Sequence, residues 1–94
     1  MALANETRLR IIQRLAERGE ETVNELATFM RMSQPRISWH LRMLELGGVV
    51  RTRREGRLTY CSLDVEAIRR RQYELEKILA AALPVGHFRS EVSG

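Results

Sequence analysis

The side chains best suited to recognition through paired hydrogen bonds gather in the segment SQPRISWHLRML, residues 33–44. At 100° per residue on a helix, Ile37, Leu41 and Leu44 point to one side and predict a buried face. The polar residues then point the other way. A helix that enters the major groove of DNA needs this division between an apolar side and an opposed polar side. The predicted DNA-binding residues of this segment are Ser33, Gln34, Pro35, Arg36, Ser38, Trp39, His40 and Arg42.

Individual side chains of this helix offer different hydrogen-bonding patterns. The amide of Gln34 matches the paired donor and acceptor of adenine, and Arg36 or Arg42 can read guanine or hold a phosphate. His40 lies at the border of the buried face, where a histidine is expected to hydrogen-bond locally or to reach a phosphate. The alternative is a solvated amphipathic helix whose polar residues recognise nothing.

Trp39 is predicted on the outward side of the same helix. A tryptophan ring is costly to leave in water, so Trp39 is expected to touch DNA, a partner or a neighbouring hairpin. Folding of the ring over Arg36 or Met43 is the alternative.

Three further arginines surround a glycine turn in the segment VVRTRREGRLTYCSL, residues 49–63. If Gly56 forms the tip of a protruding hairpin, Arg53, Arg54 and Arg57 can lie across a minor groove or against phosphates. Arginine on an edge hairpin also prevents aggregation between sheets, and the two roles are compatible. These three residues complete the predicted DNA-binding set.

Positive charge is concentrated in the same part of the chain. The chain carries sixteen basic residues, all arginine except Lys77, and its net charge is +4. Residues 31–60 hold seven arginines against two glutamates, a net charge of +5, whereas the segments before and after are close to neutral. A basic stripe confined to one segment is typical of a protein that binds nucleic acid.

The elements that would position these residues can be read from periodicity and capping. Helical spacing predicts a helix over 6–18 after Asn5, a short helix after Thr22 and a third helix capped by Ser33. Strands are predicted over 49–54 and 58–63, and a last helix begins after Asp64. This order predicts an α+β, mainly helical, winged helix-turn-helix fold with a two-stranded wing hairpin. Residues 1–83 form the predicted DNA-binding and dimerisation domain, and residues 84–94 a tail.

The last helix carries an apolar seam at coiled-coil spacing. So small a domain has little core left to receive these side chains, so the seam predicts a homodimer joined through this helix. Its members are Val65, Ile68, Gln72, Leu75, Leu79 and Ala82.

Cys61 is the single cysteine, so the chain forms no internal disulfide, and a packing role in the second wing strand is expected. The N-terminus shows no basic segment followed by an apolar run, and no apolar run approaches the ~20 residues of a membrane span. A cytoplasmic protein without a membrane partner is predicted.

Three segments, LANETRLRIIQRL, TVNELATFMRMSQPRISWHLRMLELGGVV and RREGRLTYCSL, resemble the ArsR family of bacterial winged-helix repressors. The resemblance implies a repressor that releases its operator when a signal binds. It implies a homodimer in which the first and last helices meet, which adds Leu3 and Leu9 to the predicted interface. By position, Ser33, Gln34, Arg36, Ser38 and His40 fall on the family's DNA-contacting helix and Arg54–Arg57 on its wing.

The chain departs from the family at its metal sites. Members that sense soft metals carry paired cysteines on the second helix, but residues 23–28 here contain neither cysteine nor histidine. Members that sense zinc-like ions use Asp, His and Glu on the last helix, where this chain has Val65, Ala67, Ile78 and Ala81. The sequence therefore predicts a family member without a metal site or other cofactor.

The leading interpretation is a sequence-specific DNA-binding transcriptional regulator, a dimeric repressor of ArsR type that binds a double-stranded operator and does not sense metal. A small-molecule inducer is compatible with this interpretation, but the sequence does not identify one. The alternative is a winged-helix interaction module whose basic face binds an acidic protein. An enzyme is the weakest candidate, because the two histidines and the cysteine have no catalytic partners at useful spacing.

Overall fold

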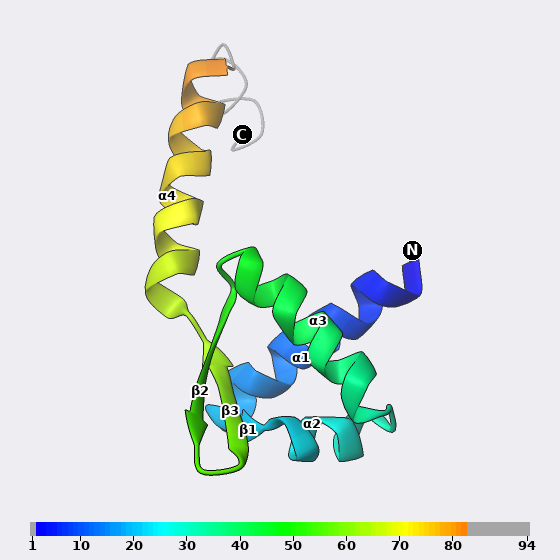
Figure 1. Ribbon diagram of the computed structural model, residues 1–94. Coiled ribbons are helices and arrows are strands. Elements are labelled where there is room, and N and C mark those ends of the chain that lie inside the picture. Colours follow the sequence, from blue (N-terminus) through cyan, green and yellow to red (C-terminus); the bar gives the residue numbers. More distant parts are fainter. Residues whose placement is uncertain (1, 83–94) are drawn as a thin grey trace.

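The computed structural model describes residues 2–82, with side chains from Ala4 onward (Figure 1). The predicted tail, 84–94, lies outside the described residues. The order of elements is α1 (Ala2–Arg18), β1 (Glu20–Thr22), α2 (Val23–Met30), α3 (Gln34–Leu46), β2 (Val50–Glu55), β3 (Leu58–Leu63) and α4 (Val65–Ala82). The predicted winged helix-turn-helix fold is confirmed.

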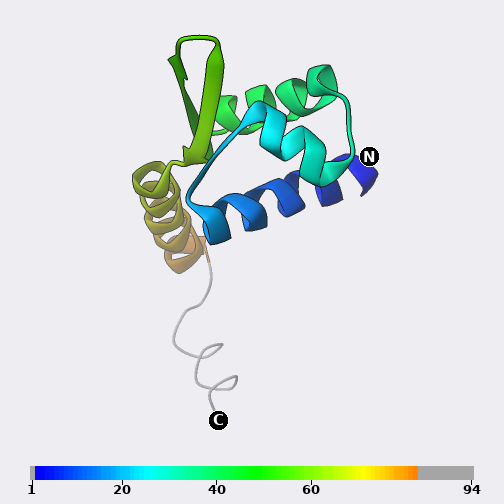
Figure 2. The same cartoon turned by 90° about the horizontal axis from the view of Figure 1, so that it is seen from below.

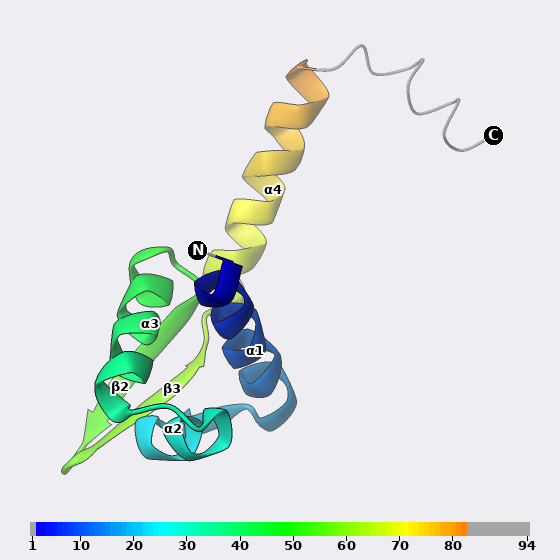
Figure 3. The ribbon, with the colours of Figure 1, turned by 90° about the vertical axis from the view of Figure 1, so that its right-hand side faces the viewer.

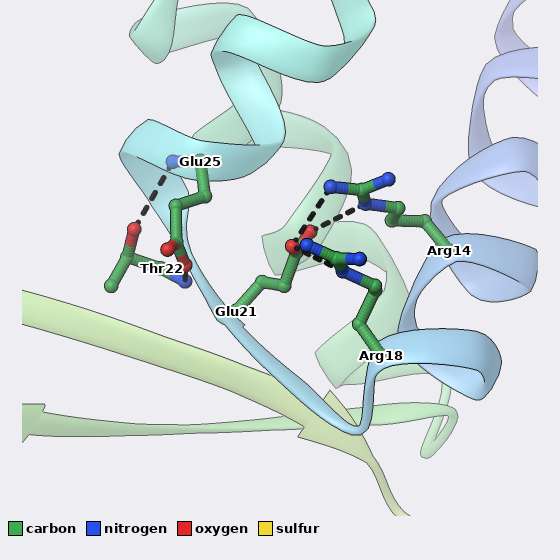
Figure 4. Close-up of polar contacts among 5 residues, drawn as sticks. All are labelled: Arg14, Arg18, Glu21, Thr22 and Glu25. Carbon is green, nitrogen blue, oxygen red and sulfur yellow. Dashed lines mark hydrogen bonds and ion pairs between the residues drawn. The ribbon is translucent and has the colours of Figure 1, made fainter.

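The helix-turn-helix is closed by local capping. The Thr22 hydroxyl accepts a hydrogen bond from the Glu25 amide at 3.1 Å, and the Glu25 carboxylate accepts one from the Thr22 amide at 2.8 Å (Figure 4). This capping box begins α2 directly after Thr22, where the helix was predicted to start. Arg31 ends α2 in the left-handed conformation at φ 56°, and Ser33 then caps α3, with Pro35 in its first turn. The chain therefore reverses direction within three residues.

Two details of the elements differ from the expectation. Helix α1 begins at Ala2 rather than after Asn5, because Ala and Leu at positions 2–4 are strong helix formers and an interior Asn costs little. The two strands of the wing are joined by a third, so the antiparallel sheet has the order β1-β3-β2. Strand β1 was missed because three residues, Glu-Glu-Thr, are too short and too polar to show alternation.

The core lies where α1, α2 and α3 cover one face of this sheet. Eight of its ten buried side chains come from these helices, and β2 and β3 supply one each. The core residues are Ile11, Leu15, Leu26, Ala27, Met30, Ile37, Leu41, Leu44, Val50 and Cys61.

A buried carboxylate joins α1 to the sheet. Glu21 is only 4% exposed, and Arg14 donates two hydrogen bonds to it at 2.9 and 3.0 Å (Figure 4). Arg18 adds a third hydrogen bond at 3.4 Å. Because two arginines compensate the charge, Glu21 can occupy a core-facing position opposite Cys61.

Helix α4 and the wing project from this body in different directions. The turn between β2 and β3 extends beyond the helices (Figures 1 and 2), and Gly56 adopts φ +63° there. Asp64 caps α4 by accepting a hydrogen bond from the Ala67 amide at 3.1 Å. The helix then leaves the body (Figure 3), giving a shape 54 × 26 × 21 Å in extent, and it buries none of its side chains.

Candidate nucleic-acid interface

Helix α3 has the two-sided character that its sequence predicts. Its buried side consists of Ile37, His40, Leu41 and Leu44. The other side is open to solvent, and seven of the eight predicted DNA-binding residues between positions 33 and 42 lie on it. They are Ser33, Gln34, Pro35, Arg36, Ser38, Trp39 and Arg42.

A polar groove joins the start of α3 to the wing. The groove has a volume of about 140 Å³, and its walls come from the N-terminal ends of α2 and α3 and from the wing turn. It brings Arg57 of the wing to the same depression as Gln34 and Ser38, which the sequence could only place on separate elements. The lining residues are Thr22, Val23, Asn24, Gln34, Ser38, Arg57, Leu58 and Thr59.

Asn24 contributes to this surface, although the sequence did not single it out. The side-chain amide of Gln34 donates a hydrogen bond to the Asn24 side-chain oxygen. This hydrogen bond orients the first residue of α3 from the second residue of α2. Its only signal in the sequence is the position of a polar residue in the first turn of α2.

The wing arginines differ in how their charges are used. Arg54 and Arg57 are exposed and, within residues 2–82, have no carboxylate in ion-pair distance. Arg53 lies on the opposite face of the hairpin from Arg54 and pairs with Glu20 at 3.0 Å and Glu55 at 3.2 Å.

The pairing of Arg53 also fixes its side chain. Its guanidinium lies over the Tyr60 ring, 4.4 Å from the centroid. Hydrogen bonds to Glu20 and then Glu55 raise the pKa of Arg53, and the hydrogen bond from Arg53 lowers the pKa of Glu20. Arg53 therefore ties the wing to β1, and of the three wing arginines it offers the least uncompensated charge to a ligand.

Among the predicted DNA-binding residues of α3, His40 is the one that is buried, and it makes the local hydrogen bond that was one of its two expected roles. Its side chain is 3% exposed and lies under α1, where Nδ1 accepts a hydrogen bond from Arg8 Nε at 3.4 Å. Burial, and then the charges of Arg8 and Arg36, lower its pKa. His40 therefore belongs to the buried side of α3 as a neutral acceptor, because the border position it occupies on the helix is covered by α1.

Trp39 is 48% exposed on the outward side of α3. The alternative from the sequence was a ring folded over Arg36 or Met43. In the structure the guanidinium of Arg8 lies over the ring, 5.1 Å from its centroid, and the His40 ring meets it edge-on at 5.0 Å. Arg8 was not singled out from the sequence, since it lies 32 positions from His40.

The predicted dimer interface is largely solvent-exposed in a single chain. Leu9, Val65, Leu75 and Leu79 are each about half exposed, at 49–55%. Gln72 and Ala82 are exposed and Ile68 is half-buried. Leu3 lies in α1, but its side chain is outside the described residues.

The groups that could bind a metal are dispersed. Residues 2–82 contain no cluster of three or more His, Cys, Asp or Glu side chains suited to holding an ion. Cys61 is fully buried, which confirms its packing role. Burial, and then Glu45 and Glu20, raise the pKa of its thiol to about 11. Within the same residues, no helix has the length and apolar character needed to cross a membrane.

Comparison with known proteins identifies relatives of the DNA-binding region. Residues 3–53 match the helix-turn-helix domain family. Over 68 residues the chain is 38% identical to the cadmium resistance transcriptional regulatory protein CadC homolog of Staphylococcus aureus, covering 72% of this chain and 56% of that protein. It is 43% identical over 61 residues to the arsenical resistance operon repressor of Escherichia coli, covering 65% and 52%. The chain spans about half the length of these curated relatives.

Solved structures share the fold as well as the sequence. The crystal structure of a possible transcriptional regulator for arsenical resistance superposes with a TM-score of 0.66 at 38% identity, covering 85% of this chain and 91% of that one. A homodimeric winged helix-turn-helix DNA-binding domain from Mycobacterium bovis, described as a possible ArsR-family regulator, gives 0.64 at 38% identity, covering 85% and 72%.

Proposed function

The chain belongs to the ArsR family of winged helix-turn-helix regulators, and from this premise we propose that it is a sequence-specific DNA-binding transcriptional repressor that acts as a homodimer. The observation that carries the proposal is the polar groove between α3 and the wing, where Gln34, Ser38 and Arg57 face a common space. It combines a helix face suited to base edges with a cation suited to phosphate.

Helix α3 enters the major groove and reads bases from its exposed side. The side-chain amide of Gln34 donates one N–H to Asn24. Its second N–H can then donate to adenine N7, and its carbonyl oxygen can accept from adenine N6. Arg36 and Arg42 extend the exposed side along the helix. Arg54 and Arg57 place their unpaired charges against the backbone next to the groove that α3 occupies.

The second subunit packs on α4. The spacing of the seam positions is symmetric about the point between Tyr73 and Glu74, so the steps between them are the same from either end. The positions are 65, 68, 72, 75, 79 and 82. Two copies of α4 can therefore pair antiparallel about a two-fold axis, with apolar side chains facing each other in every layer except the two central ones, where Gln72 meets a leucine. In that register Val65 lies against Ala82 of the partner subunit and Gln72 against Leu75 of the partner subunit.

Charges beside the seam agree with this register. Arg69 and Glu76 occupy the same flank of α4 and are both exposed. In the antiparallel pair, Arg69 lies opposite Glu76 of the partner subunit, and the two-fold axis repeats the ion pair. The proposed dimer presents its two α3 helices to successive half-sites of a palindromic operator, spaced ~34–36 Å apart.

The signal that releases the operator is proposed not to be a metal. The segments that hold soft-metal and zinc-like ligands in other members carry no cysteine or histidine here. A small-molecule inducer is compatible with the proposal, and its identity stays open. We further propose that the protein works in the cytoplasm, where its DNA partner is, and that it is not an enzyme.

The experiment is selection of bound sequences from random duplex DNA, followed by salt titration of the selected complex. Recovery of a palindromic consensus is expected. If a dimer engages about six to ten phosphates, affinity falls about 10³- to 10⁵-fold between about 50 and 200 mM salt. An acidic protein bound more tightly than any duplex would instead support an interaction module.

A further inference from the structure

One arginine of α1 makes both a hydrogen bond and a cation–π contact with α3. The Nε of Arg8 donates to His40 Nδ1 at 3.4 Å, and the guanidinium carbon lies 5.1 Å from the centre of the Trp39 ring. The Trp39 and His40 rings meet edge to face, with an interplanar angle of 70°. We call these three residues the Arg8 cluster. It joins a scaffold helix to the exposed side of the DNA-reading helix.

Arg8 differs from the arginines that hold the scaffold together. Arg14 and Arg18 pair with Glu21, and Arg53 pairs with Glu20 and Glu55. Among residues 2–82, Arg8 has no carboxylate within ion-pair distance. A planar guanidinium can lie over an aromatic face and donate sideways through Nε at the same time, which an ammonium group cannot do. Arg8 therefore fixes a ring rather than neutralising a charge.

The ring that Arg8 fixes belongs to the proposed DNA-binding surface. Trp39 lies one helical turn from Pro35 and between Arg36 and Arg42, which are exposed with it. A half-exposed tryptophan that is free to change rotamer must lose that freedom when it binds, and affinity falls accordingly. A ring already held by Arg8 and by the buried His40 avoids that loss.

We propose that Arg8 is a positioning residue, which holds the Trp39 ring in place for an apolar contact with DNA. The inference rests on the proposed function. The apolar groups available on DNA are thymine methyls in the major groove and the faces of deoxyribose. Arg8 does not itself have to touch DNA, because its effect passes through the ring.

The chain supplies its own reporter, since Trp39 is its only tryptophan. Trp39 fluorescence is measured with increasing acrylamide, first in free protein and then with the selected duplex. The test variant is Arg8→Met, which keeps the length of the stem and removes the guanidinium. The matched control is Arg10→Met, which removes one charge from the same helix, at a residue that lies over Phe29 instead.

Arg8→Met removes a partly exposed cation–π interaction with Trp39. We therefore expect it to weaken binding to the selected duplex about 2- to 5-fold more than Arg10→Met does. Without DNA, acrylamide should quench Trp39 fluorescence more strongly in Arg8→Met than in the wild type. Quenching in Arg10→Met should equal that in the wild type. Arg8→Lys should restore part of both effects. Circular dichroism of each variant identifies misfolding. A double-mutant cycle tests the proposal without fluorescence, because Arg8→Met should no longer reduce DNA affinity when Trp39 is already replaced by alanine.

A duplex with uracil in place of thymine distinguishes a contact with the thymine methyl from a contact with deoxyribose. Weaker binding of this duplex assigns the Trp39 contact to the methyl, and unchanged binding assigns it to the sugar. Unchanged quenching in Arg8→Met overturns the proposal, as does equal affinity of Arg8→Met and Arg10→Met for the selected duplex. If the wild type binds no duplex, the proposed function fails and the DNA contact fails with it. The quenching of free protein then still decides whether Arg8 holds the ring.

Discussion

The side-chain amide of Gln34 donates a hydrogen bond to the side-chain oxygen of Asn24, so the first residue of α3 is oriented by the second residue of α2. Both line the groove that opens toward Arg57. Helix α2 therefore packs against α3 and also fixes the direction of a side chain proposed to read a base.

The Gln34–Asn24 hydrogen bond predicts different effects for its two members. Gln34→Ala should cost about 1–3 kcal/mol at one base pair of each half-site and remove the preference there. Asn24→Ala should keep the base contact but loosen the side chain, so discrimination at that same base pair falls by a smaller amount. Competition binding with single-substituted duplexes measures both effects. A change in preference at a different base pair would contradict this assignment.

Wing arginines are predicted to separate into two classes. Arg54→Ala and Arg57→Ala should weaken binding to all duplexes alike, and each should lower the salt-dependence slope by about one for each phosphate that is no longer neutralised. Arg53→Ala should change that slope least, because its charge is paired with Glu20 and Glu55, and should instead lower the melting temperature. Equal slopes for all three variants would show that the ion pairs of Arg53 open on binding.

The dimer register predicts a charge-reversal rescue. Leu75→Glu places a charge in the seam and should shift the protein to monomer, with DNA affinity falling as a result. Glu76→Arg should weaken the dimer because two arginines then face each other, and Arg69→Glu combined with Glu76→Arg should restore it. Sedimentation equilibrium measures each dimerisation constant. A wild type that is monomeric at all concentrations would rule out the α4 interface.

Acid should destabilise the fold through His40. Burial, and then Arg8 and Arg36, lower its pKa below the ordinary value of 6.5, so the unfolded chain binds a proton more readily than the folded chain does. The free energy of unfolding should therefore fall as pH drops below about 6.5, and level off once the pH passes the lowered pKa. His40→Asn keeps an acceptor for Arg8 and does not titrate. Urea denaturation should show a weaker pH dependence for this variant than for the wild type, and parallel curves would contradict the role of His40.

Local signals explain which parts of the fold were predictable. The caps at Thr22, Ser33 and Asp64 and the helical spacing of apolar residues are written in short stretches of sequence, and the helices they predict are present. Strand β1 has no such signal, because its pairing with β3 depends on residues about forty positions away.

The same reasoning applies to the candidate site. The exposed side of α3 follows from helix geometry, so most of it was predicted. The burial of His40 beside Arg8 and the pairing of Arg53 with Glu20 involve separations of 32 and 33 residues, which periodicity does not encode. Tertiary contacts therefore determine which of the predicted residues have a charge or a hydrogen-bond donor available to DNA.

The central claim is that the exposed side of α3 reads a DNA sequence, and competition binding at physiological salt tests it most directly. Wild-type protein should bind the selected duplex at least about 10³-fold more tightly than a scrambled duplex of equal length. Gln34→Ala should reduce that ratio while leaving affinity for the scrambled duplex unchanged. Equal affinity of the wild type for the two duplexes would contradict the claim.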